Sequence, residues 1–69
     1  MYMITILVNE TQIEIEESAN IHQLLQKMNT TIDGIAIAIN NKIVSKNSWE
    51  SQQFNQNDNI LIIKATQGG

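Results

Sequence analysis

The sequence predicts an α+β fold in which one helix packs on one face of one β-sheet. Three observations support this prediction. Several short segments alternate apolar and polar residues, which is the period of a half-buried strand. One segment, residues 21–28, instead repeats its apolar residues with the period of a helix. Finally, 13 of the 69 residues are isoleucine, whose β-branched side chain favours strands.

The composition is that of a single small domain. A chain of 69 residues has room for one core, and the absence of cysteine excludes disulfides, thiolate metal sites and nucleophilic thiols. The formal net charge of −3 argues against nucleic-acid binding, which needs a basic face. No apolar run has the length of a membrane span, and no signal-peptide pattern is present. We therefore expect a cytoplasmic protein that is a monomer on its own, away from membranes.

The first two predicted strands form a hairpin. Residues 2–8 alternate, and residues 12–16 alternate again after a polar turn at residues 9–11. Two alternating runs joined by a short polar turn are typical of a hairpin with one face on the core and one in water. The side chains expected to face the core are Ile4, Ile6, Val8, Ile13 and Ile15.

The predicted helix runs from about residue 21 to residue 28 and ends at Asn29. Asn20 is a favourable N-cap, and Gln23 three residues later can complete a capping box. So short a helix is not stable alone, and it must therefore pack its apolar face on the sheet. That face consists of Ile21, Leu24, Leu25 and Met28.

Residues 35–39 predict the next strand, with the isoleucines on the helix side of the sheet and Ala36 and Ala38 on the other side. The pair Asn40-Asn41 can adopt positive φ and close a tight turn. Residues 43–44 then return as a short strand.

A crossover without a clear period, residues 45–54, leads to the last strand. Its Trp49 and Phe54 are expected to anchor it to the core. A turn at residues 57–59 precedes the strand at residues 60–65.

The last strand begins with four apolar residues, Ile60-Leu61-Ile62-Ile63. A sheet covered by one helix should alternate apolar and polar residues along a strand, yet this run is apolar at all four positions. Either Leu61 and Ile63 or Ile60 and Ile62 must therefore face away from the helix. Exposed apolar surface can mark a partner site, and Leu61 and Ile63 are our docking candidates. Alternatively, a central strand simply tolerates apolar residues on its outer face.

The sequence finishes on Thr66-Gln67-Gly68-Gly69. A frayed terminus or a cut linker could also leave two glycines. Because Gly68 and Gly69 have no Cβ, however, such a segment can thread a narrow channel. Four extended residues reach roughly 13 Å beyond a sheet. We expect residues 1–65 to form the domain and residues 66–69 a flexible C-terminal tail.

The middle and the end of the sequence share a set of residues with one known family. The set comprises Ala36-Ile37-Ala38-Ile39-Asn40-Asn41-Lys42-Ile43-Val44, Trp49, Asp58 with Ile60, Leu24-Leu25 and Gly68-Gly69. It resembles the ThiS family, the sulfur-carrier proteins of thiamine biosynthesis, and the resemblance covers nearly the whole chain. Two positions depart from the family pattern. Ser45 stands where a proline often follows the Ile-Val pair, and Asn57 stands where a glycine often precedes the aspartate.

The resemblance implies a β-grasp, or ubiquitin-like, fold: a mixed sheet of about five strands in which the last strand lies beside the first. It also implies a function. A ThiF-like adenylyltransferase, similar to ubiquitin-activating enzymes, would use ATP and Mg²⁺ to adenylate the carboxylate of Gly69. A cysteine desulfurase would supply the sulfur for a thiocarboxylate, which a ThiG-like thiazole synthase would receive. Gln67, Gly68 and Gly69 would enter the partner active sites. The chain itself would bind no cofactor or metal and would be a co-substrate rather than an enzyme.

Other functions stay open at this point. The molybdopterin-synthase small subunit is a related sulfur carrier, and a ubiquitin-like modifier would instead join its terminus to lysines. A non-catalytic β-grasp binding module would not use the tail at all. His22 is interpreted as a solvated helix residue, and Glu14, Glu16 and Glu17 as a solvated strand edge, because neither group has the spacing of a metal or catalytic site.

Overall fold

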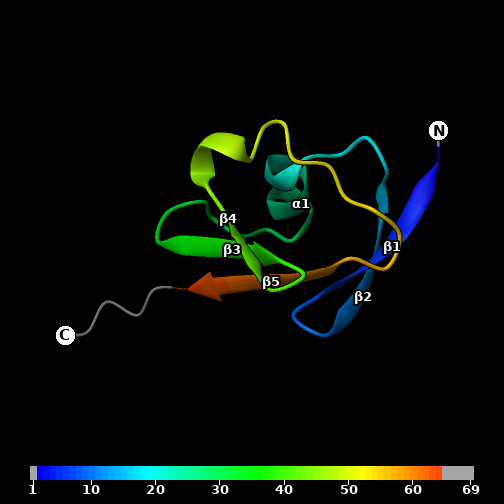
Figure 1. The fold of residues 1–69 in the computed structure, drawn as a ribbon, viewed down its shortest axis with the longest axis horizontal. Coiled ribbons are helices and arrows are strands. Elements are labelled where there is room, and N and C mark those ends of the chain that lie inside the picture. Colours follow the sequence, from blue (N-terminus) through cyan, green and yellow to red (C-terminus); the bar gives the residue numbers. More distant parts are fainter. Residues whose placement is uncertain (1, 65–69) are drawn as a thin grey trace.

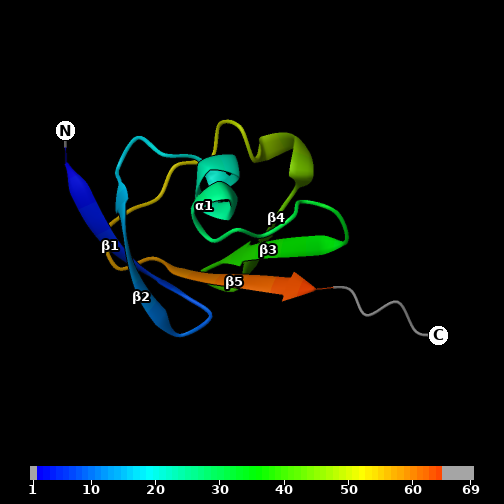
Figure 2. The same cartoon turned by 180° about the vertical axis from the view of Figure 1, so that it is seen from behind.

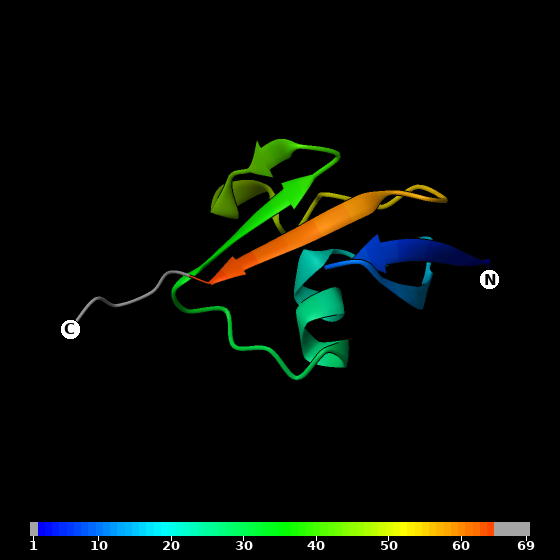
Figure 3. The same ribbon diagram turned by 90° about the horizontal axis from the view of Figure 1, so that it is seen from below.

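The computed structural model describes residues 2–64, which form a five-stranded sheet with one α-helix on one face (Figures 1 and 3). The elements are β1 (Met3–Val8), β2 (Thr11–Glu16), α1 (Ile21–Lys27), β3 (Ile35–Ile39), β4 (Lys42–Val44), the short 3₁₀ helix η1 (Lys46–Ser48) and β5 (Asn59–Lys64). The predicted α+β class is confirmed. The predicted tail, with Gln67, Gly68 and Gly69, and the boundary placed at residue 65 lie outside the described residues.

The sheet has the strand order β2-β1-β5-β3-β4, so the last strand of the chain lies in its middle. β5 is parallel to β1 and antiparallel to β3, which makes the sheet mixed. Both features agree with the β-grasp arrangement implied by the family resemblance. β5 ends on the side of the molecule opposite the start of β1 (Figure 1).

Asparagine makes the two tight hairpin turns. Asn9 and Glu10 have φ of 48° and 70°, and Asn40 and Asn41 have φ of 50° and 71°. Two consecutive residues with positive φ give a turn whose twist matches that of the flanking strands, and asparagine tolerates this region better than most residues. The first turn occupies two residues, so β2 begins at Thr11, one residue before the predicted start.

Helix α1 is capped at both ends by hydrogen bonds. The Asn20 side chain accepts a bond from the Gln23 N–H (3.0 Å), and the Gln23 side chain accepts one from the Asn20 N–H (2.8 Å), which confirms the capping box. The helix ends at Lys27, with Met28 as its C-cap, slightly earlier than predicted. The reason is Asn29, whose φ of 55° breaks the helix and lets the Thr30 N–H reach back to the Leu25 carbonyl at 2.9 Å.

The core lies between the helix and one face of the sheet. The buried helix residues are Ile21, Leu24 and Leu25, and the isoleucines of β3 join them while Ala36 and Ala38 face the other way, as predicted. The core side chains are Ile4, Ile6, Val8, Ile15, Ala19, Ile21, Leu24, Leu25, Ile37, Ile39, Trp49, Phe54, Ile60 and Ile62. Ile13 is half-buried and packs against this cluster.

The crossover from β4 to β5 passes the start of α1, a placement visible from both sides of the molecule (Figures 1 and 2). Trp49 and Phe54 are both buried, which confirms that they anchor the crossover. The Trp49 indole N–H donates to the Val44 carbonyl (3.2 Å), and the Trp49 carbonyl accepts from the Ile21 N–H (3.3 Å). The crossover therefore joins the edge strand β4 to the beginning of the helix.

A proline at position 45 is expected to stabilise the domain. Ser45 already has φ −59°, which is the value a proline ring imposes, and its backbone N–H has no hydrogen-bond partner within residues 2–64. The Ser45→Pro substitution should raise the free energy of unfolding by about 0.4–1 kcal/mol, because it restricts the unfolded chain. Urea denaturation followed by circular dichroism measures this change; a decrease would show that the Ser45 side-chain bond to the Asn47 N–H (3.3 Å) matters more.

Candidate functional site

The face of the sheet opposite the helix carries exposed apolar side chains. On β5, Ile60 and Ile62 point into the core, whereas Leu61 is 49% exposed and Ile63 is 41% exposed. The pair that faces away from the helix is therefore Leu61 and Ile63, the pair chosen as docking candidates.

Three neighbours extend this surface across the sheet. Ala38 lies between Leu61 on β5 and Ile43 on β4, and Ala36 lies beside Ile63. Ile43 is 68% exposed. Ala38 is only 5% exposed, so the exposed apolar area comes mainly from the larger side chains beside it. We call these five residues, Ala36, Ala38, Ile43, Leu61 and Ile63, the outer apolar patch.

Ile43 is the patch residue that sequence reasoning missed. A signal for it was present. The two-residue turn at Asn40-Asn41 fixes the register of the hairpin and pairs Ala38 with Ile43. Residues paired across a ladder point to the same face, so assigning Ala38 to the outer face also assigns Ile43 to it.

The strand that carries Leu61 and Ile63 is held on both sides. On the β3 side it has a full antiparallel ladder. On the β1 side the parallel ladder stops at Val8 and Ile60, and the Asn9 side chain continues it. Its Oδ1 accepts from the Ile62 N–H (2.8 Å) and its Nδ2 donates to the Ile62 carbonyl (3.4 Å). The amide of Asn9 thus takes the place of a backbone peptide beside β5.

A buried carboxylate fixes the start of β5. Asp58 is 7% exposed; one of its oxygens accepts from the Asn40 side chain (2.9 Å) and the other from the Asn55 N–H (2.8 Å). Asn40 also accepts from the Asn59 N–H at 3.0 Å. The turn between β3 and β4 is thereby tied to the turn before β5. Asn57 has φ 70°, so it adopts the conformation for which glycine is favoured at this position.

Along the chain, the last strand of the outer apolar patch comes just before the predicted tail. β5 carries two residues of the patch and ends at Lys64, and residues 65–69 follow it. A partner that covered the patch would therefore meet the chain immediately before the segment that contains Gly69.

The other residues considered from the sequence do not form a site. His22 is half-buried rather than fully solvated, and its ring packs edge-on against Trp49 with centroids 5.8 Å apart. Glu14, Glu16 and Glu17 are exposed, as predicted. Among residues 2–64 no group of three or more metal-binding side chains comes together. In the same part of the chain, no helix is long and apolar enough to cross a membrane.

Comparison with known proteins agrees with the fold and with the residues that suggested a family. The sequence model of the ThiS family matches residues 4–69, which includes the predicted tail. The chain belongs to the ThiS family. Among curated relatives, the sulfur carrier protein ThiS of Escherichia coli (strain K12) is 30% identical over 64 residues, which cover 93% of this chain and 97% of that protein.

A solved structure of another ThiS protein has the same fold. The crystal structure of the thiamine biosynthesis protein ThiS from Geobacter metallireducens superposes with a TM-score of 0.80 and covers 96% of this chain and all of that chain. Its sequence identity is 16%, so this likeness concerns the fold alone. It confirms the β-grasp arrangement that the residues of the ThiS family pattern implied.

Proposed function

We propose that this chain is a sulfur carrier for thiamine biosynthesis that holds its sulfur as a thiocarboxylate on Gly69. Membership of the ThiS family supports the carrier role, and the relative from Escherichia coli bears the name sulfur carrier protein. In this role the chain is a co-substrate of other enzymes and not a catalyst. The thiazole moiety of thiamine is the product that would receive the sulfur.

The chemistry on Gly69 has two steps. A carboxylate is a poor electrophile, so its oxygen first attacks the α-phosphorus of ATP, which forms an acyl-adenylate and releases pyrophosphate. A thiol reductant, itself oxidised to a disulfide, releases the outer sulfur of the donor's persulfide as sulfide, and this sulfide then displaces AMP from the carbonyl carbon and leaves a thiocarboxylate. Mg²⁺ and ATP belong to the activating enzyme, so no cofactor is assigned to the carrier.

The partners follow from these steps. A ThiF-like adenylyltransferase would activate Gly69, a cysteine desulfurase would be the indirect source of sulfur, and a ThiG-like thiazole synthase would accept it. We place all of them in the cytoplasm, where ATP is available. The outer apolar patch is the proposed docking surface, because Leu61 and Ile63 lie on the strand that leads to Gln67, Gly68 and Gly69.

One observation carries the proposal most directly. The family match spans both the strand with the outer apolar patch and the Gly68-Gly69 pair that follows it. A plain binding module would have no need to combine an exposed apolar strand with a segment that can enter a narrow active site. The absence of cysteine is compatible with the role, since no internal thiol could attack the activated carbonyl.

The terminal peptide is expected to gain sulfur. The peptide is analysed after incubation of the chain with a ThiF-like enzyme, ATP and a sulfur donor. Exchange of one oxygen of the activated carboxylate for sulfur should raise the peptide mass by roughly 16 Da, the difference between the two atomic masses. Methionine oxidation gives a similar gain, so the peptide that ends in Gly69 must be isolated, since it contains none of the three methionines. A peptide that never gains sulfur contradicts the proposal. Amide adducts on lysines would instead indicate a ubiquitin-like modifier.

Charge in the outer apolar patch should weaken partner binding more than it weakens the fold. Leu61→Lys or Ile63→Lys is expected to reduce affinity for the adenylyltransferase about tenfold or more, because a charge would enter an apolar interface. The free energy of unfolding should change by about 0.5 kcal/mol or less. Ile32→Lys is the matched control: Ile32 is 41% exposed, as Ile63 is, but lies outside the sheet. If isothermal calorimetry shows the same loss of affinity for all three variants, the outer apolar patch is not the docking surface.

A further inference from the structure

β2 forms one edge of the sheet, and β1 is its only neighbouring strand within residues 2–64. The backbone hydrogen bonds that β1 makes with residues 57 and 58 show which of its peptide groups point away from β2. The Leu7 N–H donates to the Asp58 carbonyl (2.9 Å), and the Thr5 carbonyl accepts from the Asn57 N–H (2.7 Å). The peptide groups of these two residues therefore point toward the β5 side and away from β2.

The residues opposite them on β2 have the complementary orientation. Gln12 is paired with Leu7 and Glu14 with Thr5, and these pairs exchange no hydrogen bonds. In an antiparallel ladder the N–H and C=O of such residues point away from the neighbouring strand. Gln12 and Glu14 therefore present two donors and two acceptors at the free edge, with no partner within residues 2–64. The peptide groups of Ile13 face β1 instead.

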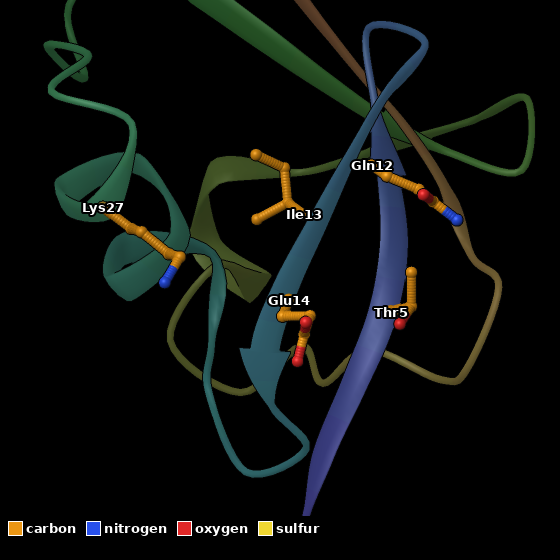
Figure 4. Close-up of a pocket in the computed structure, with 5 residues that line it drawn as sticks. All are labelled: Thr5, Gln12, Ile13, Glu14 and Lys27. Carbon is orange, nitrogen blue, oxygen red and sulfur yellow. The ribbon is translucent and has the colours of Figure 1, made fainter.

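An open hollow of about 380 Å³ lies along this edge. Figure 4 shows Ile13 projecting from β2 toward α1, which carries Lys27, while Gln12 and Thr5 lie on the other side of the β2 ribbon. The edge thus has an inner side with a half-buried isoleucine and a lysine, and an outer side with polar residues. A strand laid along it could place alternate side chains on these two sides.

The charges decide which strand fits. Glu14 and Glu16 are exposed on the outer side, and Lys27 is exposed on the inner side. A second copy of β2 would set glutamates against glutamates, which is unfavourable, and charged residues commonly protect edges from such self-association. A strand with basic residues on its outer side and apolar residues on its inner side would find opposite charges at Glu14 and Glu16. A one-residue slip would move its basic residues toward Lys27.

We propose that the free edge of β2 binds an extended segment of another protein, which adds as a sixth strand with basic side chains beside Glu14 and Glu16 and apolar side chains beside Ile13. The bonding groups are the N–H and C=O of Gln12 and Glu14. β1 separates this edge from β5, and the outer apolar patch lies on β3, β4 and β5. Both surfaces can therefore be occupied together, so one carrier could be held by a second protein while its tail is in use.

Hydrogen exchange on the ¹⁵N-labelled full chain tests this inference. The probe is the peptide acetyl-Lys-Val-Lys-Val-Lys-amide, with a peptide carrying glutamate in place of each lysine as control. Binding as a strand should slow exchange of the amides of Gln12 and Glu14 and leave Ile13 and Ile15 unchanged, because those amides already bond to β1. Protection confined to other residues, or no saturable change up to about 1 mM peptide, would overturn the proposal.

Two variants separate backbone pairing from simple charge attraction. Gln12→Pro removes an N–H that faces the free edge without changing a charge, which an edge strand tolerates, and should abolish protection at Glu14 while the other amide signals persist. Glu14→Lys with Glu16→Lys should weaken binding roughly tenfold, since two attractions become repulsions. Glu50→Lys makes the same kind of charge change after η1 and should leave binding unchanged. Equal weakening by Glu50→Lys, or dimerisation of the unmodified chain through β2 in sedimentation, would contradict the proposal.

Discussion

A chain that lacks Gly69 is expected to accept sulfur at least about 100-fold more slowly than the full chain, because a misplacement of about 1 Å at a reacting atom can cost that much. Deletion moves the terminal carboxylate back to Gly68, by roughly 3.3–3.6 Å of extended chain. The activating enzyme would then find no carboxylate oxygen at the α-phosphorus of its ATP. Mass spectrometry of the terminal peptide, followed over time, measures the rate of loading.

The fold should survive this deletion, so loss of loading can be assigned to the reacting group. Within residues 2–64 no buried side-chain nitrogen or oxygen lacks a hydrogen-bond partner, and the core cluster is assembled from residues 4–62. Circular dichroism of the deletion variant should therefore match that of the full chain. Ile32→Ala, at an exposed position outside the sheet and the tail, should load within a few-fold of the full chain. Normal loading without Gly69 would show that another group carries the sulfur.

Local structure could be predicted from the sequence because its causes are local. Alternation in residues 2–8 and the helical spacing from Ile21 both reflect which face meets the core. Asn20 and Gln23 sit at the spacing of a capping box, and the structure contains both bonds. The adjacent asparagines at 40 and 41 close a hairpin with positive φ. In each case a short segment contains the whole physical reason for its conformation.

The pairing of distant strands could not be obtained in this way. The parallel contact of β1 with β5 joins residues more than fifty positions apart, and it was expected only from the resemblance to a known family. The Asn9 amide that bonds Ile62 depends on that same contact. The free peptide groups of Gln12 and Glu14 likewise follow from which side of β1 faces β5. Periodicity gives the face of each side chain but not the neighbour of each strand.

The same distinction applies to the candidate site, of which part could be predicted from the sequence and part could not. The sequence limited the exposed pair on β5 to two choices, and the core contacts of Ile60 and Ile62 select Leu61 and Ile63. Ile43 could have been included once the register of the second hairpin was fixed by its turn. The role of Gly69 stays a prediction from the sequence and the family, since residues 65–69 lie outside the described part of the chain.

The crossover that contains Trp49 supports the outer apolar patch through the edge strand β4. This strand contributes Ile43 to the patch and has only one neighbouring strand within residues 2–64. Trp49 is 1% exposed and bonds to the carbonyl of Val44 and, through its own carbonyl, to the N–H of Ile21. The Lys46 ammonium lies 5.7 Å from the centre of its ring. The Trp49 side chain thus fills the core and bonds to the edge strand, while the Trp49 backbone bonds to the start of the helix.

Replacement of Trp49 by alanine is expected to cost about 3–5 kcal/mol of unfolding free energy, from lost burial and the cavity left behind. A domain of this size has only a few kcal/mol to about 10 kcal/mol in total, so much of the variant should be unfolded at 37 °C. Trp49→Phe keeps most of the packing but leaves the Val44 carbonyl without its donor, and should cost about 1–3 kcal/mol. Ile43→Ala, at an exposed position, should change stability by about 0.5 kcal/mol or less. Urea denaturation followed by circular dichroism ranks the three variants. A cost for Trp49→Ala no larger than that for Ile43→Ala would mean that the crossover does not hold β4 in place, and the outer apolar patch would then have to be stabilised by the β3 ladder alone.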